Sequence, residues 1–168
     1  MTMKFSLIAT TLATLALSLS ACQRGEATAT TAAAEKDGVT ASVEIRDAWC
    51  RPTPNGAKTA ACYLTIEASR DNRVTGVATP LAAGAAIHDM TMDRGVMRMS
   101  EMAAGLPLTA GTPVVLAPGG KHLMLTGLTA PLVEGVSTPL TLTFSATPAM
   151  TVQAAVRQPT EREGRGAH

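Results

Sequence analysis

Aromatic residues are almost absent from this chain of 168 residues. The whole set is one Trp, one Tyr and two Phe, namely Trp49, Tyr63, Phe5 and Phe144. So few rings do not favour a surface on which bases or sugars stack. An excess of one charge is also lacking, because 14 Lys and Arg residues oppose 13 Asp and Glu residues. These two absences exclude the usual features of a nucleic-acid-binding protein.

The chain also lacks an apolar run long enough for a membrane-spanning helix, which needs about 20 residues. Its longest such run, residues 7–19, follows Lys4 and is typical of the apolar part of a signal peptide. We predict a signal peptide over residues 1–21. Its removal takes away Lys4 and no acidic residue, so that 13 residues of each sign remain.

The residues Leu19, Ser20, Ala21 and Cys22 resemble the bacterial lipobox, in which the cysteine becomes the lipid-modified N-terminus. Gln23 in the next position implies sorting to the outer membrane. The resemblance predicts a bacterial periplasmic protein that a lipid on Cys22 anchors to the inner leaflet of the outer membrane. An ordinary signal peptide cleaved near Ala21, with Cys22 unmodified, is the alternative.

Cysteine is scarce, with three residues in all. If Cys22 carries lipid, Cys50 and Cys62 remain as an even pair in an oxidising compartment. They flank residues 52–58, a Pro- and Gly-containing stretch that predicts a loop between two adjacent strands. Such strands bring Cα atoms within bridging range, so we expect a disulfide. Two buried thiols or a metal-binding pair are the alternatives.

Three regions differ in composition. Residues 22–41 contain almost nothing to bury, which predicts a flexible linker behind the lipid anchor. Residues 158–168 are charged and predict a disordered tail. Residues 42–157 form the domain, where short apolar segments separated by Pro and Gly indicate an all-β sandwich or barrel. Strands are expected at residues 42–46, 60–67, 73–78, 85–92, 96–102, 114–116, 122–126, 140–145 and 151–157.

Histidine and methionine are unevenly placed. Five of the nine methionines fall within residues 90–102, just after His88. His122 and Met124 are two residues apart, so on a strand both side chains leave the same face. His88 and Met99 lie on either side of a predicted hairpin turn.

The turn contains Asp93, Arg94 and Gly95 and decides which residues face each other. A two-residue loop at positions 93–94 sets His88 opposite Met99, and Met90 opposite Met97. A three-residue loop with Gly95 at positive φ shifts the pairs by about one residue.

Two imidazoles and two thioethers predict a soft metal site. Thioether is a poor ligand for Ca²⁺, Mg²⁺ or Zn²⁺ and a good one for Cu(I). The histidines bind only when neutral, so we expect affinity to weaken below about pH 6.5. Met90 and Met97 are candidates for an auxiliary soft shell. Packing is the competing interpretation for each of Met90, Met92, Met97 and Met102, because Met commonly fills cores.

These residues resemble the PCuAC family of periplasmic copper chaperones. The family pattern runs histidine, ten residues, methionine, about 21 residues, then His-x-Met. His88 and Met99 have the ten-residue gap, and His122 and Met124 close the pattern after 22 residues. Further similarity lies in residues 48–49, 51–54, 60–61, 63–66, 95–99 and 118–125, whereas Cys50 and Cys62 stand where the resemblance implies small residues.

The resemblance covers residues 42–157 and implies a cupredoxin-like β-sandwich with Greek-key type connections. It implies Cu(I) binding by His88, Met99, His122 and Met124. It also implies copper delivery to an acceptor such as a cytochrome oxidase subunit or its assembly factor.

The sequence also permits functions other than copper delivery. Copper sequestration in the envelope needs the same site, and a non-metal lipoprotein that binds a protein partner needs none. A blue-copper electron carrier needs a cysteine beside two histidines, and none follows Cys62. We expect no enzyme, because the chain has no nucleophile elbow, phosphate loop or spaced carboxylate pair.

Overall fold

The computed structural model describes residues 30–36, 39–161 and 163. The predicted signal peptide and Cys22 lie outside these residues. Eleven strands account for most of the described chain: β1 Thr30–Lys36, β2 Val39–Cys50, β3 Thr59–Ala68, β4 Asn72–Ala78, β5 Ala82–Asp93, β6 Val96–Glu101, β7 Leu106–Leu108, β8 Val114–Leu116, β9 His122–Leu128, β10 Ser137–Phe144 and β11 Met150–Val156. No helix in this part of the chain is long and apolar enough to cross a bilayer.

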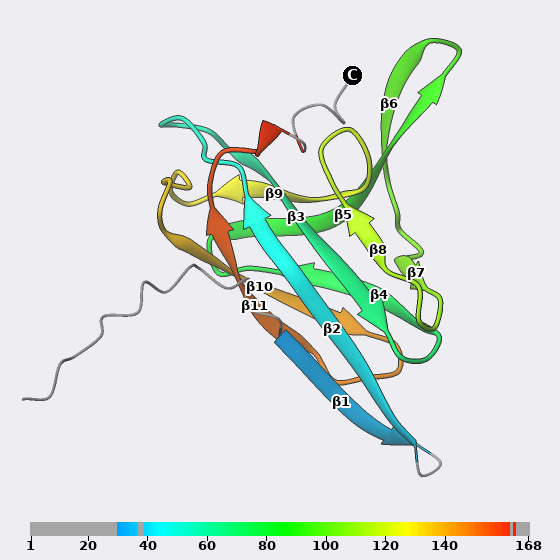
Figure 1. Ribbon diagram of the computed structural model, residues 1–168. Helices are drawn as coiled ribbons and strands as arrows, with labels where there is room; N and C mark the ends of the chain where they lie inside the picture. Colours follow the sequence, from blue (N-terminus) through cyan, green and yellow to red (C-terminus); the bar gives the residue numbers. More distant parts are fainter. Residues whose placement is uncertain (1–29, 37–38, 162, 164–168) are drawn as a thin grey trace, which may run out of the picture.

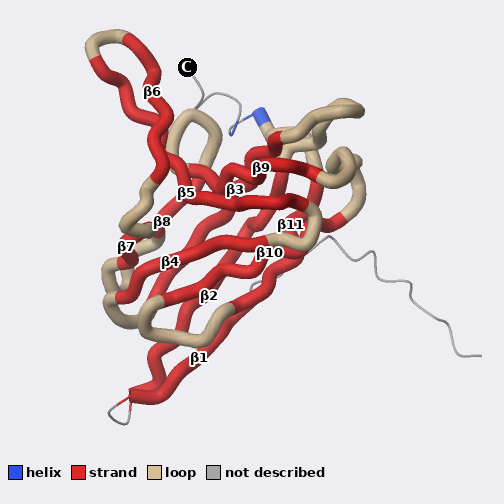
Figure 2. The backbone as a smooth tube through the Cα atoms, turned by 180° about the vertical axis from the view of Figure 1, so that it is seen from behind, coloured by secondary structure: helices blue, strands red, loops and turns tan. Residues whose placement is uncertain are grey.

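The strands follow one hydrogen-bonded path in the order β6-β5-β9-β3-β2-β11-β10-β4-β7. This path folds over on itself into the two layers of a β-sandwich (Figures 1 and 2), in which β4 also lies against β5. β8 pairs with β3, and β1 with β2. Neighbours distant in sequence, such as β3 with β9 and β4 with β10, have Greek-key type connections. The predicted all-β sandwich is confirmed.

Alternation along the strands builds the core between the layers. In β11, for example, Met150, Val152, Ala154 and Val156 are buried while the residues between them are exposed. In β9, Leu123 and Leu125 enter the core. The neighbours of these leucines therefore lie on the outer face of the sheet.

Two strands were not predicted. β1 lies inside the segment expected to be a flexible linker, residues 22–41, and pairs antiparallel with β2 from Thr30 opposite Ile45 to Lys36 opposite Val39. A segment with almost nothing to bury can form this strand, because main-chain pairing along a strand edge needs no apolar side chain. β7 follows Gly105 and ends the path at the edge of the sheet.

The described residues of the predicted tail make hydrogen bonds with the end of β11. The Arg157 guanidinium donates to both carboxylate oxygens of Glu163 at 2.9 Å. The backbone N–H and the hydroxyl of Thr160 donate to the same carboxylate at 2.7 Å. These bonds hold the described part of the tail against the end of β11.

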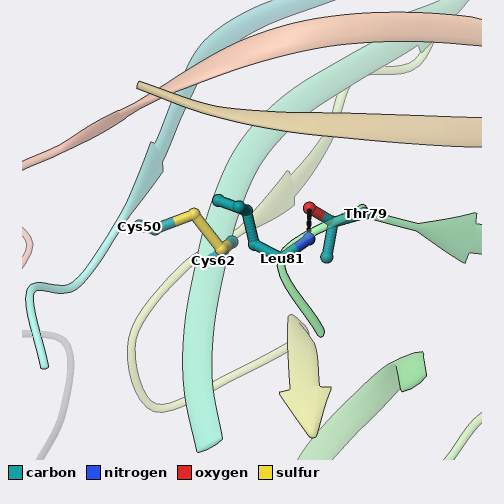
Figure 3. The surroundings of a disulfide bond; sticks show 4 residues. All are labelled: Cys50, Cys62, Thr79 and Leu81. Atoms are coloured by element: carbon teal, nitrogen blue, oxygen red, sulfur yellow. Dashed lines mark hydrogen bonds between the residues drawn. A yellow bond between two sulfur atoms is a disulfide. The ribbon is translucent and has the colours of Figure 1, made fainter. Parts of the chain in front are cut away.

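The expected disulfide is present between Cys50 and Cys62 (Figure 3). The two cysteines are cross-strand partners in β2 and β3, with Cα atoms 4.0 Å apart, and both are fully buried. Leu81 lies in the surroundings of the bond, and its backbone N–H donates to the Thr79 hydroxyl at 3.4 Å. The bridge is part of the core, so the metal-pair alternative is wrong.

Candidate metal centre

The candidate ligands gather on the outer face of β5, β6 and β9. In β9, His122 and Met124 both point away from the core side on which Leu123 and Leu125 lie. β5 pairs with β9 so that His88 stands directly opposite His122. The two imidazole rings meet edge to face, with centroids 5.7 Å apart. The structure thus brings together two histidines that are distant in sequence.

Backbone contacts orient the His122 ring. Its side chain is only 5% exposed, and its Nδ1 lies 3.0 Å from the Gly120 carbonyl oxygen. A carbonyl only accepts, so Nδ1 carries the proton and donates. The Nε2 lone pair is then free for a ligand, which is the arrangement common among metal-binding histidines.

The His88 ring, unlike that of His122, has a nitrogen without a hydrogen-bond partner. Its Nδ1 is buried and has no hydrogen-bond partner. Buried polar atoms without partners are rare and costly. A metal ion bound at this nitrogen would satisfy it, and the pair of imidazoles therefore fits a metal.

Met124 follows His122 by two residues on β9, and an alanine lies opposite it on each neighbouring strand. Its partners are Ala61 on β3 and Ala86 on β5. Small neighbours on both sides leave its flexible thioether room to lean toward the histidines. Met124 is half-buried.

Met99 approaches the histidines from the other end, and the predicted register needs correction. The β5–β6 hairpin pairs His88 with Glu101 and Met90 with Met99. The loop residues are Arg94 and Gly95, with φ of 50° and 81°, as a type I′ turn requires. Both predicted registers are therefore wrong. The observed register differs from the two-residue-loop prediction by two residues, an even number. Met99 therefore lies on the same face of the sheet as His88 and is its diagonal neighbour.

The auxiliary candidates Met90 and Met97 lie at different places on the hairpin. Met90 is half-buried opposite Met99, whereas Met97 is 43% exposed opposite Met92 near the hairpin tip. Met102 packs against the core, as the competing interpretation expected. Packing does not account for Met92, which is 63% exposed.

An aromatic wall that no sequence pattern indicated lies beside His122 on the β3 side. The Tyr63 ring lies 6.5 Å from the His122 ring and 4.6 Å from the Trp49 ring. Burial raises the pKa of the Tyr63 phenol. The Arg157 guanidinium stacks 4.2 Å from the Trp49 ring centre. The wall lies on the β3 side of His122, and His88 on β5 lies on the other side, next to the exposed strand β6.

The carboxylates near the two histidines do not gather around the imidazole rings. Glu101 is the cross-strand partner of His88 but is exposed. Asp89 leaves the opposite face and pairs with Lys121 at 3.3 Å. Among the residues that the structure describes, no three His, Cys, Asp or Glu side chains cluster as a metal site. The Met99 and Met124 thioethers are soft donors on the face that carries the two imidazoles, and they favour a soft ion.

Comparison with known proteins adds sequence and structural relatives. The model of the family described as "Putative lipoprotein LpqE-like" matches residues 43–156. "Putative lipoprotein Lxx21020" from Leifsonia xyli subsp. xyli (strain CTCB07) is 33% identical over 138 residues, which cover 82% of this chain and 81% of that relative.

Solved structures with a similar fold include DR1885 from Deinococcus radiodurans. Its apo solution structure has a TM-score of 0.55 and 26% identity, and the match covers 95% of this chain and 99% of that one. The apo PCuAC domain from PmoF1 has a TM-score of 0.58 at 22% identity, covering 70% and 94%. This second likeness concerns the fold alone. The chain belongs to the LpqE-like lipoprotein family and has the cupredoxin-like fold of PCuAC domains.

Proposed function

We propose that the protein is a Cu(I)-binding metallochaperone of the bacterial periplasm, anchored by lipid at Cys22. His88, His122, Met99 and Met124 hold the ion as cargo. The observation that carries the proposal is the direct pairing of His88 with His122, each with a ring nitrogen free for a ligand. A Cu(I) form of DR1885 among the structural relatives supports copper as the metal.

The environment of the four side chains favours transfer over permanent storage. His122 is buried and fixed, whereas Met99 is 51% exposed on β6. Among the described residues no thiolate takes part, because Cys50 and Cys62 are bridged in the core. An acceptor thiolate can therefore approach at Met99 and replace the neutral ligands one by one. Delivery toward the copper centres of cytochrome c oxidase is the route that we propose.

Anaerobic titration with Cu(I) against a chromophoric chelator tests the site. The full chain is used in detergent with Cys22→Ser, because a free thiol would itself bind Cu(I). We expect Met99→Leu and Met124→Leu each to weaken binding at least tenfold, or about 1.4 kcal/mol. Met150→Leu is the matched control, since Met150 lies in the core. Equal affinity in all three variants would contradict the assignment of Met99 and Met124 as ligands, and no competition with the chelator by the parent chain would leave a lipoprotein that binds no copper.

Delivery is tested separately in cells grown at low copper. Deletion of the gene should lower cytochrome c oxidase activity, and added copper should restore it. Copper sensitivity with normal oxidase activity would instead indicate sequestration. A chain carrying both methionine substitutions should fail to complement the deletion.

A further inference from the structure

We infer that the tip of the β5–β6 hairpin holds a second, weaker Cu(I) site, formed by Met92 and Met97. The inference rests on the proposed function for the identity of the metal. It concerns residues outside the four ligands described above.

The hairpin separates its side chains into two unlike faces. Met90, Met92, Met97 and Met99 share one face with His88, because side chains alternate along both strands. The opposite face carries the exposed ion pair of Asp93 with Arg98, at 2.8 Å, and one exposed apolar residue, Val96. The hairpin projects from the body of the sandwich (Figures 1 and 2), and every residue of β6 is exposed. Met92, Met97 and Met99 on this face therefore lie in solvent, whereas Met90 is half-buried.

Register places the four methionines in two directly opposed pairs. Met92 faces Met97, and Met90 faces Met99. Asp93 and Val96 flank the two-residue turn as a hydrogen-bonded pair, so each methionine pair occupies the alternate position, where side chains approach most closely. Cβ atoms in such pairs lie about 4.5–5.5 Å apart. Two flexible thioethers at that separation can close on one soft ion, which two valines or leucines there could not do.

The tip pair lies in line with the histidines. Alternate residues of a strand are about 7 Å apart, so the order along β5 is Met92, Met90, His88 in equal steps. Exposure falls along this line from 63% at Met92 to half-buried at Met90 and His88. An ion taken up at the exposed tip therefore meets more enclosed soft ligands toward His122. We assign the tip pair to acquisition and release of the ion.

Stoichiometry tests the inference in the same Cys22→Ser chain. The unmodified face should bind a first Cu(I) tightly and a second more weakly. Met92→Leu with Met97→Leu should weaken the second step at least tenfold and leave the first unchanged. Val115→Met and Val133→Met, added to that variant, restore two exposed thioethers that are not strand partners. They should not restore the second step.

Methyl NMR of the methionines supplies an independent readout. The ε-methyl signals of Met92 and Met97 should shift only with the second equivalent of Cu(I), after those of Met99 and Met124.

The outcomes separate the two proposals. One equivalent in the parent chain, or a second step that survives loss of Met92 and Met97, overturns the tip site while the proposed function stands. Recovery through Val115→Met and Val133→Met would show binding by any exposed thioether and also overturn it. Absence of any Cu(I) binding would overturn both proposals.

Discussion

Removal of the Cys50–Cys62 bridge should cost the domain about 3 kcal/mol. The two cysteines are separated by 12 positions, and closing a loop of this length in the unfolded chain costs about that much entropy at 25 °C. Both side chains are fully buried in the core cluster. Cys50→Ala with Cys62→Ala should therefore cost slightly more than reduction alone, since it also removes buried sulfur.

Urea unfolding of three samples measures this difference: the oxidised chain, the chain in excess reductant and the double variant. The single tryptophan, Trp49, is buried and reports the transition by fluorescence. We expect a lower midpoint and a thermal midpoint lower by about 10 °C or more. A loss below about 1 kcal/mol in both samples would refute the argument that the bridge acts by restricting the unfolded chain.

The same variant also separates stability from metal binding. Cys62 pairs with Leu123 on the core side of β9, away from His122. Where the double variant is folded, its Cu(I) affinity should equal that of the parent chain. A tenfold loss of affinity would contradict the separation of the two faces.

Two further predictions concern the tail and a close approach of strands. Hydrogen bonds from Arg157 lower the pKa of Glu163 from 4.5 to about 2, so its stabilisation is present above pH 4.5 and is lost as the pH falls toward 2. Between pH 6 and pH 3 the parent chain should lose about 1 kcal/mol more unfolding free energy than Glu163→Gln, allowing for solvent screening of this partly exposed pair. Urea unfolding of both chains at the two pH values measures the difference. Gly127 has a φ of +68°, and an added Cβ would lie 2.8 Å from that of Ala83. Gly127→Ala should thus destabilise by about 2 kcal/mol, and Gly56→Ala, which shares a positive φ but meets nothing, by about 1 kcal/mol; equal losses would show that the contact does not matter.

Alternation and turn residues were enough to predict most strands. Residues 114–116, for example, form β8 with the predicted bounds. β7 was missed because Pro107 lies at its centre, and proline in a short run indicates a turn. The structure tolerates it because β7 is the last strand of the path, where a missing N–H costs no ladder bond.

The hairpin register was missed for a different reason. The sequence around Gly95 permits several loops, and a type I′ turn here requires Arg94 at positive φ, which non-glycine residues rarely adopt. The pairing of His88 with His122 was also beyond prediction from spacing, because β5 and β9 are not consecutive. Only the assembled sheet sets these two residues opposite each other.

Strand β9 ties the stability of the fold to the candidate metal centre. Leu123 and Leu125 face the core, while His122 and Met124 face outward. A slip of one residue would exchange the two sets, burying polar groups and exposing leucines. Burial of the leucines therefore also holds the imidazole beside His88. A loss of Cu(I) affinity in Leu123→Ala would thus report loosened strand pairing, and only a variant of unchanged stability identifies a ligand.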